Sequence, residues 1–264
     1  MRRSTFILLT IVAGIPATVS SARAQSTSQR VVATDGIVQV IYPSRPGACG
    51  DGSTYISNVL GRNQSYVGDA VWSGQSRGER PLCVRGPARV VATVLNGEIT
   101  RLRAYVGPVP SSGPADRSLS VGATEASAWL GDLVSRGTPR VASQAILPLV
   151  LADAEEPWPL LIKVARDPNR SRDVHQSALT WLSSGIADHL GIADADAHES
   201  DDDQMRAQAV FTLTQRPKTE SVPALIDLAR TAKHPAARRA AIFWLGQSGD
   251  ARAVDVYAEL LGLR

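Results

Sequence analysis

Residues 240–250 read AAIFWLGQSGD, and the spacing of their small and apolar residues recurs upstream. An apolar residue directly follows Ala241, and Leu245 lies four positions after Ala241. Residues four positions apart lie on the same face of an α-helix. The small residues of the copies are Ala145, Ala178, Ala209 and Ala241, and the leucines are Leu149, Leu182, Leu213 and Leu245. A period of about 32 residues predicts a stack of helical hairpins, that is, an α-solenoid.

A second helix is predicted after the repeated one in several copies. Residues 158–166 (WPLLIKVAR) match residues 222–230 (VPALIDLAR), and residues 253–261 (AVDVYAELL) form a further copy. After Ala178 an acidic segment, residues 186–203, takes the place of a clear second helix. We therefore expect most units to contain an inner and an outer helix.

Residues 205–213 (MRAQAVFTL) and 237–246 (ARRAAIFWLG) resemble the inner helices of short HEAT repeats, of the kind also found in phycobilin lyases. In that family the inner helix begins V-R-x-x-A and ends A-L-G, and a Gly-Asp turn leads to an outer helix with V-P-x-L. The resemblance covers about residues 140–264. Upstream, His175 stands in the place of the family's Arg, and Pro148 lies within the first inner helix. The resemblance implies an α-solenoid with a protein or peptide partner, and the residues of lyase activity are not found.

The first half of the chain has the pattern of β-structure and resembles no named domain. Residues 36–42, 89–95 and 98–106 are rich in β-branched residues or alternate between polar and apolar. Asn96 and Gly97 between the last two segments favour a type I′ turn, which predicts a β-hairpin. Residues 45–52 contain Pro and three Gly and are expected to form a loop.

The change from one pattern to the other divides the chain. We expect a signal peptide at 1–24, a β-rich domain at 25–107, a Pro- and Ser-rich linker at 108–118 and a HEAT-like helical domain at 119–264. The fold class is therefore predicted to be α+β, with a small disulfide-linked β domain followed by an α-solenoid.

The first 24 residues have the features of a secretory signal peptide. A basic start precedes a short apolar run at 6–15 and an A-x-A cleavage pattern at 22–24. Gln25 follows that pattern, which argues against a lipid-anchored Cys. We expect a periplasmic or extracellular protein with no stable membrane insertion after cleavage. Cleavage would leave 25 basic and 25 acidic residues, and this balance argues against nucleic acid as a partner.

Two cysteines, Cys49 and Cys83, lie in the β-rich half. In an exported chain two cysteines most simply form one disulfide, which would stabilise the fold by about 3–4 kcal/mol. A metal-ligand or nucleophile role for either cysteine is the less favoured alternative.

Three patterns that resemble catalytic or metal sites are weak. Residues 74–78 (GQSRG) match a nucleophile elbow, but Pro81 prevents an immediate helix and no His precedes His175. Residues 194–203 are acidic without the spacing of a calcium loop, and Asp203 or a neighbour is expected to cap the helix that follows. His175, His189 and His234 lack partners at ligand spacing. We therefore expect no catalytic residue, metal or cofactor.

The helical wheel separates the aromatic residues of the inner helices. Trp181 and Trp244 fall on the face of the repeated Ala and Leu and are expected in the core, together with Ala209, Leu213, Ala241 and Leu245. The residues two positions after each Ala lie on a different face of the helix: Leu147, Thr180, Phe211 and Phe243. This face either binds a partner or is covered by neighbouring repeats. The predicted partner-binding residues are Leu147, Phe211, Arg239 and Phe243.

The favoured function is an exported, non-enzymatic scaffold or binding protein whose solenoid holds a protein or peptide. The alternative is an enzyme or small-ligand-binding protein with its site in the β-rich half, formed by Asp51, Ser53 or Ser76. A binding groove without clustered titratable groups would favour the first, and a deep pocket with perturbed pKa values would favour the second.

Overall fold

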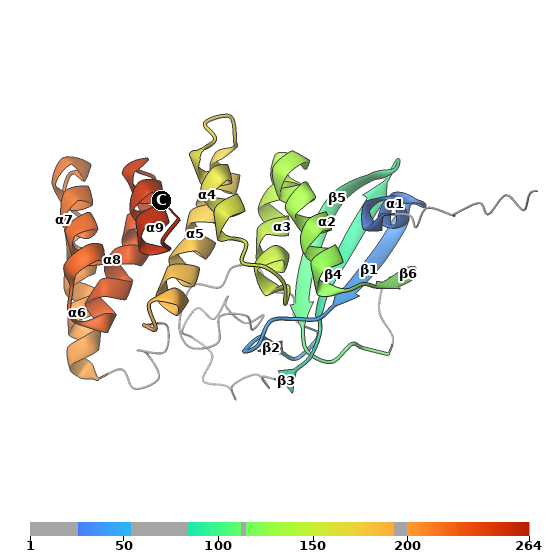
Figure 1. Cartoon of the computed structure of the whole chain (residues 1–264), viewed down its shortest axis with the longest axis horizontal. Coiled ribbons are helices and arrows are strands. Elements are labelled where there is room, and N and C mark those ends of the chain that lie inside the picture. The colour runs from blue at the N-terminus through green and yellow to red at the C-terminus, as the bar shows by residue number, and fades with distance from the viewer. Residues whose placement is uncertain (1–25, 54–83, 112–114, 193–199, 264) are drawn as a thin grey trace, which may run out of the picture.

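The computed structural model describes residues 26–53, 84–111, 115–192 and 200–263, and Figure 1 shows a β-sheet at one end with helical hairpins stacked beside it. The prediction of an α+β fold with a helical solenoid is confirmed at this level. The expected signal peptide lies outside the described residues.

The main sheet has four strands in the order β5-β4-β1-β6. The strands are β1 (Gly36–Tyr42), β4 (Ala88–Leu95), β5 (Glu98–Val106) and β6 (Arg117–Ser120). Strand β4 is antiparallel to both β1 and β5, whereas β6 runs parallel to β1. Strand β5 therefore lies at one edge of this sheet, a position that matters for the site below.

A short second sheet pairs β2 (Cys49–Gly50) with β3 (Val84–Arg85). The prediction that all of residues 45–52 form a loop was therefore wrong for these two positions. Gly50 can pair in this sheet because it has no side chain. An added Cβ would lie 2.5 Å from the Val106 carbonyl oxygen. Tight packing of backbone on backbone, which the sequence pattern does not reveal, favours the extended conformation here.

The predicted β-hairpin is confirmed. Asn96 and Gly97 join β4 and β5 with φ angles of 53° and 73°, as a type I′ turn requires. The Asp35 carboxylate accepts hydrogen bonds from the backbone N–H groups of Asn96 at 2.8 Å and Gly97 at 3.0 Å.

Nine helices are found in the described part of the chain. They are α1 (Thr27–Val32), α2 (Ala123–Arg136), α3 (Pro139–Leu151), α4 (Trp158–Arg166), α5 (Arg172–His189), α6 (Asp201–Leu213), α7 (Lys218–Thr231), α8 (Pro235–Gln247) and α9 (Arg252–Leu260). Three consecutive pairs pack closely along the helical half: α2 with α3, α4 with α5 and α7 with α8. None of the helices in the described ranges is long and apolar enough to cross a membrane.

The sheet and the first hairpins share one hydrophobic core. Val38 and Val40 of β1 and Leu102 of β5 belong to the same buried cluster as the helical residues of α2 and α3. The Tyr42 hydroxyl donates a hydrogen bond to the Pro148 carbonyl oxygen of α3 at 2.9 Å. Strand β6 begins inside the segment assigned to the linker from sequence, so the connection itself completes the sheet. The β-rich half is thus packed directly on the solenoid.

The helices are not stacked in the order of the sequence. Helix α5 contacts α8, and α6 packs on the far side of α8, so the inner layer runs α3, α5, α8, α6. In the outer layer α9 contacts both α4 and α7. Figure 1 shows the same arrangement, with α8 and α9 between α4 and α5 on one side and α6 and α7 on the other. We call α3, α5, α6 and α8 the inner helices.

This order explains where the predicted core positions were right and where they were wrong. Ala145, Ala178, Ala241 and Leu245 are fully buried, as expected, and so is Trp181. Ala209 is exposed and Leu213 and Trp244 are only half-buried, contrary to expectation. Helix α6 stands at the end of the stack, so it has an inner neighbour on one side only.

The end of the stretch at residues 240–250 is adapted to the outer helix that follows. The Tyr257 hydroxyl of α9 donates to the Ile242 carbonyl oxygen of α8. A Cβ at Gly246 would lie 2.5 Å from that hydroxyl oxygen, so glycine is needed there. Gly249 turns the chain with a φ of 65°, and the Asp250 carboxylate accepts from the backbone N–H of Arg252 at 3.0 Å. The Gly-Asp turn therefore starts α9.

Candidate functional site

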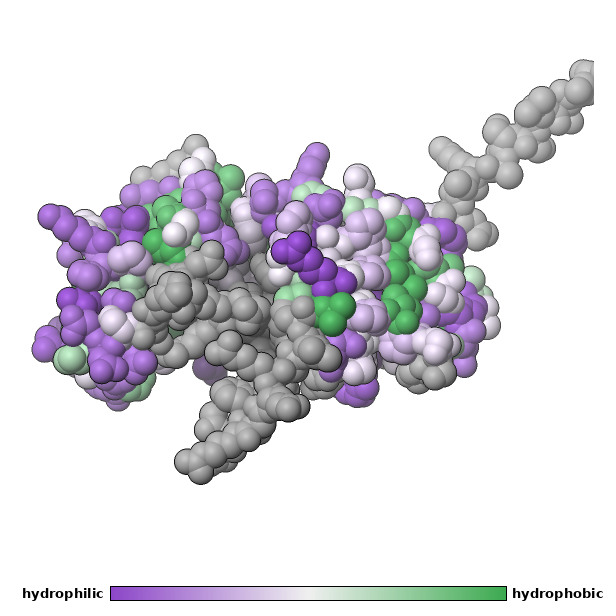
Figure 2. Space-filling model, turned by 90° about the horizontal axis from the view of Figure 1, so that it is seen from below, coloured by the Kyte–Doolittle hydropathy of each residue, from purple (hydrophilic) through white to green (hydrophobic). Residues whose placement is uncertain are grey.

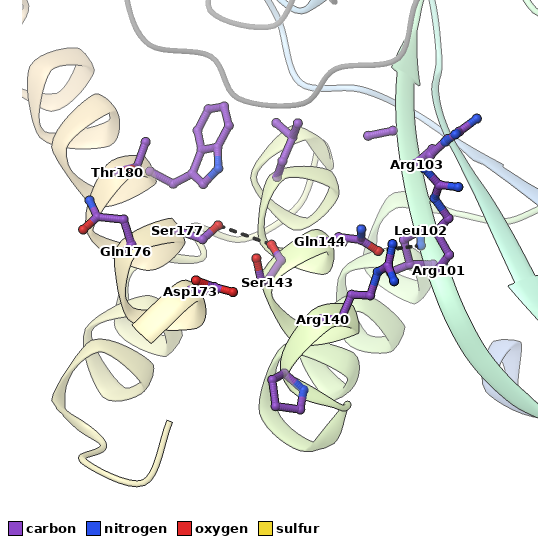
Figure 3. Close-up of a pocket in the computed structure, with 14 residues that line it drawn as sticks. Arg101, Leu102, Arg103, Arg140, Ser143, Gln144, Asp173, Gln176, Ser177 and Thr180 are labelled. Atoms are coloured by element: carbon purple, nitrogen blue, oxygen red, sulfur yellow. Dashed lines mark hydrogen bonds between the residues drawn. The ribbon is translucent and has the colours of Figure 1, made fainter. Parts of the chain in front are cut away.

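A cleft of about 750 Å³ opens between the edge strand β5 and the inner helices α3 and α5 (Figure 3). We call it the β5–α3–α5 cleft. It lies where the β-rich half meets the solenoid, and its walls come from both. Its size is that of a pocket for a small molecule or a few residues of peptide.

The wall formed by β5 and α3 is cationic. Arg101 and Arg103 come from the strand, and Arg140 extends from the first turn of α3 toward it (Figure 3). Arg101 and Arg140 are exposed, and neither forms an ion pair with any residue that the structure describes. Farther along α3, the Gln144 Oε1 accepts a hydrogen bond from the Leu102 backbone N–H at 2.9 Å. The Gln144 amide group thus occupies the edge of the sheet and keeps its own N–H donors.

The wall formed by α5 is polar. Asp173, Gln176, Ser177 and Thr180 are spaced so that they share one face of the helix. Hydrogen bonds hold these side chains in place. The Gln176 Nε2 donates to the Gln247 Oε1 of α8 at 2.9 Å, and the Ser177 hydroxyl donates to the Ser143 carbonyl oxygen of α3 at 3.3 Å. Of the residues lining this wall, only Asp173 is acidic.

Apolar residues form the floor of the cleft. Leu147, which the sequence analysis assigned to partner binding, lines the cleft and has only 5% of its surface exposed. Trp181 and Leu102 are also buried lining residues. The floor is therefore hydrophobic and the rim is charged, as in many binding sites.

The other predicted partner-binding residues lie farther along the inner layer. Phe211 of α6 and Phe243 of α8 are half-buried, and both contact Trp244, with ring centroids 5.0 Å and 4.9 Å apart respectively. We call these three residues the aromatic cluster. Arg239 is half-buried one helical turn before Phe243. The structure thus groups Phe211 with Phe243 but places Leu147 in the separate β5–α3–α5 cleft.

The surface seen from below is mainly hydrophilic over the helices, and its hydrophobic residues are scattered in small groups (Figure 2). The large exposed hydrophobic residues of the described chain lie in separate segments: Val84, Leu95, Val109, Met205 and Leu263. Isolated exposed residues of this kind are normal for globular proteins. They identify no binding face, so the cleft and the aromatic cluster are the stronger candidates.

Of the residues of the alternative site, the structure describes only Asp51 and Ser53. The Asp51 carboxylate accepts from the Ser53 backbone N–H at 2.7 Å, which is a local turn. Ser76 lies outside the described residues, as does the 74–78 motif. Cys49 is buried, and Cys83 lies outside the described residues, so the disulfide remains a prediction. No group of three His, Cys, Asp or Glu in the described ranges is placed to hold a metal.

The remaining polar candidates lie at the ends of helices. Ser200 caps α6, accepting from the Asp203 backbone N–H at 3.2 Å. The helix begins at Asp201, so Asp203 lies in its first turn and is not its cap, contrary to expectation. His234 is the residue that precedes α8, and His175 Nε2 lies 2.6 Å from the Asp167 carbonyl oxygen. His189 is exposed in the last turn of α5.

Most charged and polar residues of the cleft were not predicted from the sequence, which singled out only Leu147 and Thr180 among the lining residues. Arg140, Gln144 and Leu147 share a face of α3, and Asp173, Ser177 and Thr180 share a face of α5. The helical spacing of polar residues on an inner helix was the available signal. The contribution of β5 could not be predicted, because nothing in the sequence places that edge strand beside α3.

Comparison with known proteins finds HEAT repeats in the last four helices. A family model described as HEAT repeats matches residues 195–263, which cover α6 to α9. The expected HEAT repeats in the C-terminal half are thus confirmed, and the N-terminal half matches no family model. Neither a curated protein nor a solved structure matches this chain.

Proposed function

We propose that this protein is an exported, non-enzymatic binding protein that holds a segment of a protein partner along its inner helices. HEAT repeats commonly mediate protein–protein interaction, and this chain contains them. The observation that carries the proposal is the β5–α3–α5 cleft, which combines a hydrophobic floor with exposed polar and charged groups on rigid elements.

The aromatic cluster extends the proposed binding surface toward the end of the stack. In protein interfaces, truncation of an aromatic or Arg side chain most often causes a large loss of binding energy. Phe211 and Phe243 retain part of their surface, and Arg239 lies on the same helix as Phe243. Leu147 would contact the partner at the cleft floor, and these four residues would together bind one extended segment.

Export is supported by the sequence of residues 1–24, and a Cys49–Cys83 disulfide would suit an oxidising compartment. Strand pairing supports the bridge, since Val84, the neighbour of Cys83 in sequence, lies opposite Gly50, the neighbour of Cys49. Intact-mass spectrometry of protein from the cell envelope should give the mass of residues 25–264 less two hydrogens. A full-length mass or two free thiols would contradict this part of the proposal.

Partner binding is tested by affinity capture from a cell-envelope extract, followed by titration of the purified partner. The variant combining Phe211→Ala and Phe243→Ala should bind at least about tenfold more weakly, since each ring would lose contact with the partner. Leu245→Ala is the matched control, because Leu245 is buried and lies on the same helix as Phe243. It should lower stability and leave binding unchanged at temperatures where it stays folded.

Two results would contradict the proposal. Unchanged binding by the double Phe variant would show that the aromatic cluster takes no part. An equal loss of binding in both variants would show that only the stability of α8 matters.

A further inference from the structure

We infer that the β5–α3–α5 cleft binds an acidic segment of the partner, with its carboxylates against β5 and the start of α3. This inference rests on the proposed function and adds the chemistry of the ligand. It comes from the charges that line the cleft, three arginines against one aspartate.

The arginines are suited to a ligand rather than to the fold. Arg101 and Arg140 are exposed at the rim, and both lack an ion-pair partner among the described residues. Elsewhere in the described helices, several exposed arginines do have one, as Arg166 does with Asp255 at 2.9 Å. A guanidinium group binds a carboxylate with two parallel hydrogen bonds, which gives both energy and orientation.

The neutral groups next to the arginines are also arranged as donors. Gln144 uses its Oε1 to accept from Leu102, so its Nε2 donors remain for a ligand. Because Leu102 belongs to the edge of the sheet, this contact also fixes the Gln144 side chain beside the two exposed arginines. A peptide carboxylate or carbonyl oxygen placed there would accept from both kinds of donor.

Asp173 limits the ligand further. It lies at the start of α5, across the cleft from the cationic wall (Figure 3). A segment that is acidic along its whole length would place a carboxylate against Asp173, and like charges repel. The preferred segment therefore has acidic residues at one end and neutral or basic residues at the other.

Fluorescence anisotropy of the mature protein with labelled octapeptides tests this inference. The probes are a peptide with two Glu at one end and Gln elsewhere, its isosteric all-Gln form and an all-Glu form. We expect the half-acidic peptide to bind about tenfold more tightly than the all-Gln form. Its affinity should fall as salt is raised, because part of the attraction is screened. The all-Glu peptide should gain affinity from Asp173→Asn, whereas the half-acidic peptide should not.

Charge-reversal variants locate the site. Arg140→Glu and Arg101→Glu should each weaken binding of the half-acidic peptide by about tenfold, and the milder Arg140→Gln by a smaller factor. The control is Arg216→Glu, since Arg216 is exposed after α6 and does not line the cleft. It should leave the affinity within about twofold. Thermal unfolding of each variant confirms that these exposed changes leave the fold intact.

Several outcomes would overturn the inference. One is equal binding of the acidic and all-Gln peptides, and another is an equal loss with Arg216→Glu. If succinate displaces the half-acidic peptide at a similar concentration, the cleft is a site for small dicarboxylates and not for a peptide. Normal partner binding by Arg140→Glu and Arg101→Glu would remove the cleft inference and leave the proposed function standing. If the half-acidic peptide binds but no partner is captured, the cleft inference stands and the proposed function fails.

Discussion

Among single residues, Asp35, Asn96 and Gly97 show how local chemistry sets up the edge of the cleft. The backbone N–H groups of Gly97 and Asn96 bind the Asp35 carboxylate and lower its pKa below the usual range. Since the folded-state pKa lies below that of the unfolded chain, this stabilisation is complete above about pH 4. It is lost as the pH falls through the folded-state value. At neutral pH the Asp35 carboxylate therefore stabilises the turn and the start of β5.

Replacing Gly97 by Val should strain this turn. Open space surrounds the Gly97 Cα, so the cost comes from its φ of 73° and not from a clash. A β-branched residue is strongly disfavoured there, and we expect a loss of more than about 1 kcal/mol in the free energy of unfolding. Gly97→Asn is the control and should cost less, because Asn tolerates positive φ. Equal denaturant midpoints for the Gly97→Val variant and the original protein would contradict the role of the turn.

At the scale of elements, α8 and α6 show why equal sequence patterns have different environments. Both carry the Ala–Leu spacing, yet Ala241 and Leu245 are fully buried while Ala209 is exposed. Helix α8 lies between α5 and α6, whereas α6 has a single inner neighbour. Burial thus follows the place of a helix in the stack and not its pattern alone.

Leu245→Ala should therefore cost far more than the same truncation in α6. We expect about 2–5 kcal/mol for Leu245→Ala, because it leaves a cavity between packed helices. Leu213→Ala should cost clearly less, since Leu213 is already half-exposed. Urea unfolding of the two variants measures the difference. Similar losses would indicate that α6 is as enclosed as α8.

The sequence predicted these elements better than their arrangement. Helical periodicity located the inner helices, and Asn96-Gly97 located the hairpin, because both are local signals. The order of the hairpins is not local: nothing in residues 240–250 shows that α8 contacts α5. The same limit applies to the site. The face with Leu147 and Thr180 was predicted, but the cationic wall needs β5 beside α3, a contact between distant segments.

At the scale of the whole molecule, the sheet closes one end of the solenoid and helps to form its site. Strand β5 is exposed to pairing with other chains because it lies at the sheet edge, and α3 with Gln144 covers part of it. The inner helices continue from there to the aromatic cluster. In the proposed binding mode, the charged cleft and the aromatic cluster would contact the same partner.

The most direct test of this account is hydrogen–deuterium exchange of the mature protein with and without its purified partner. Binding along the inner helices should slow amide exchange in β5, α3, α5, α8 and α6, because the partner would cover them and reduce local opening. The outer helices α4, α7 and α9 should exchange at unchanged rates. Protection confined to these outer helices, with β5 and α3 unaffected, would contradict the account.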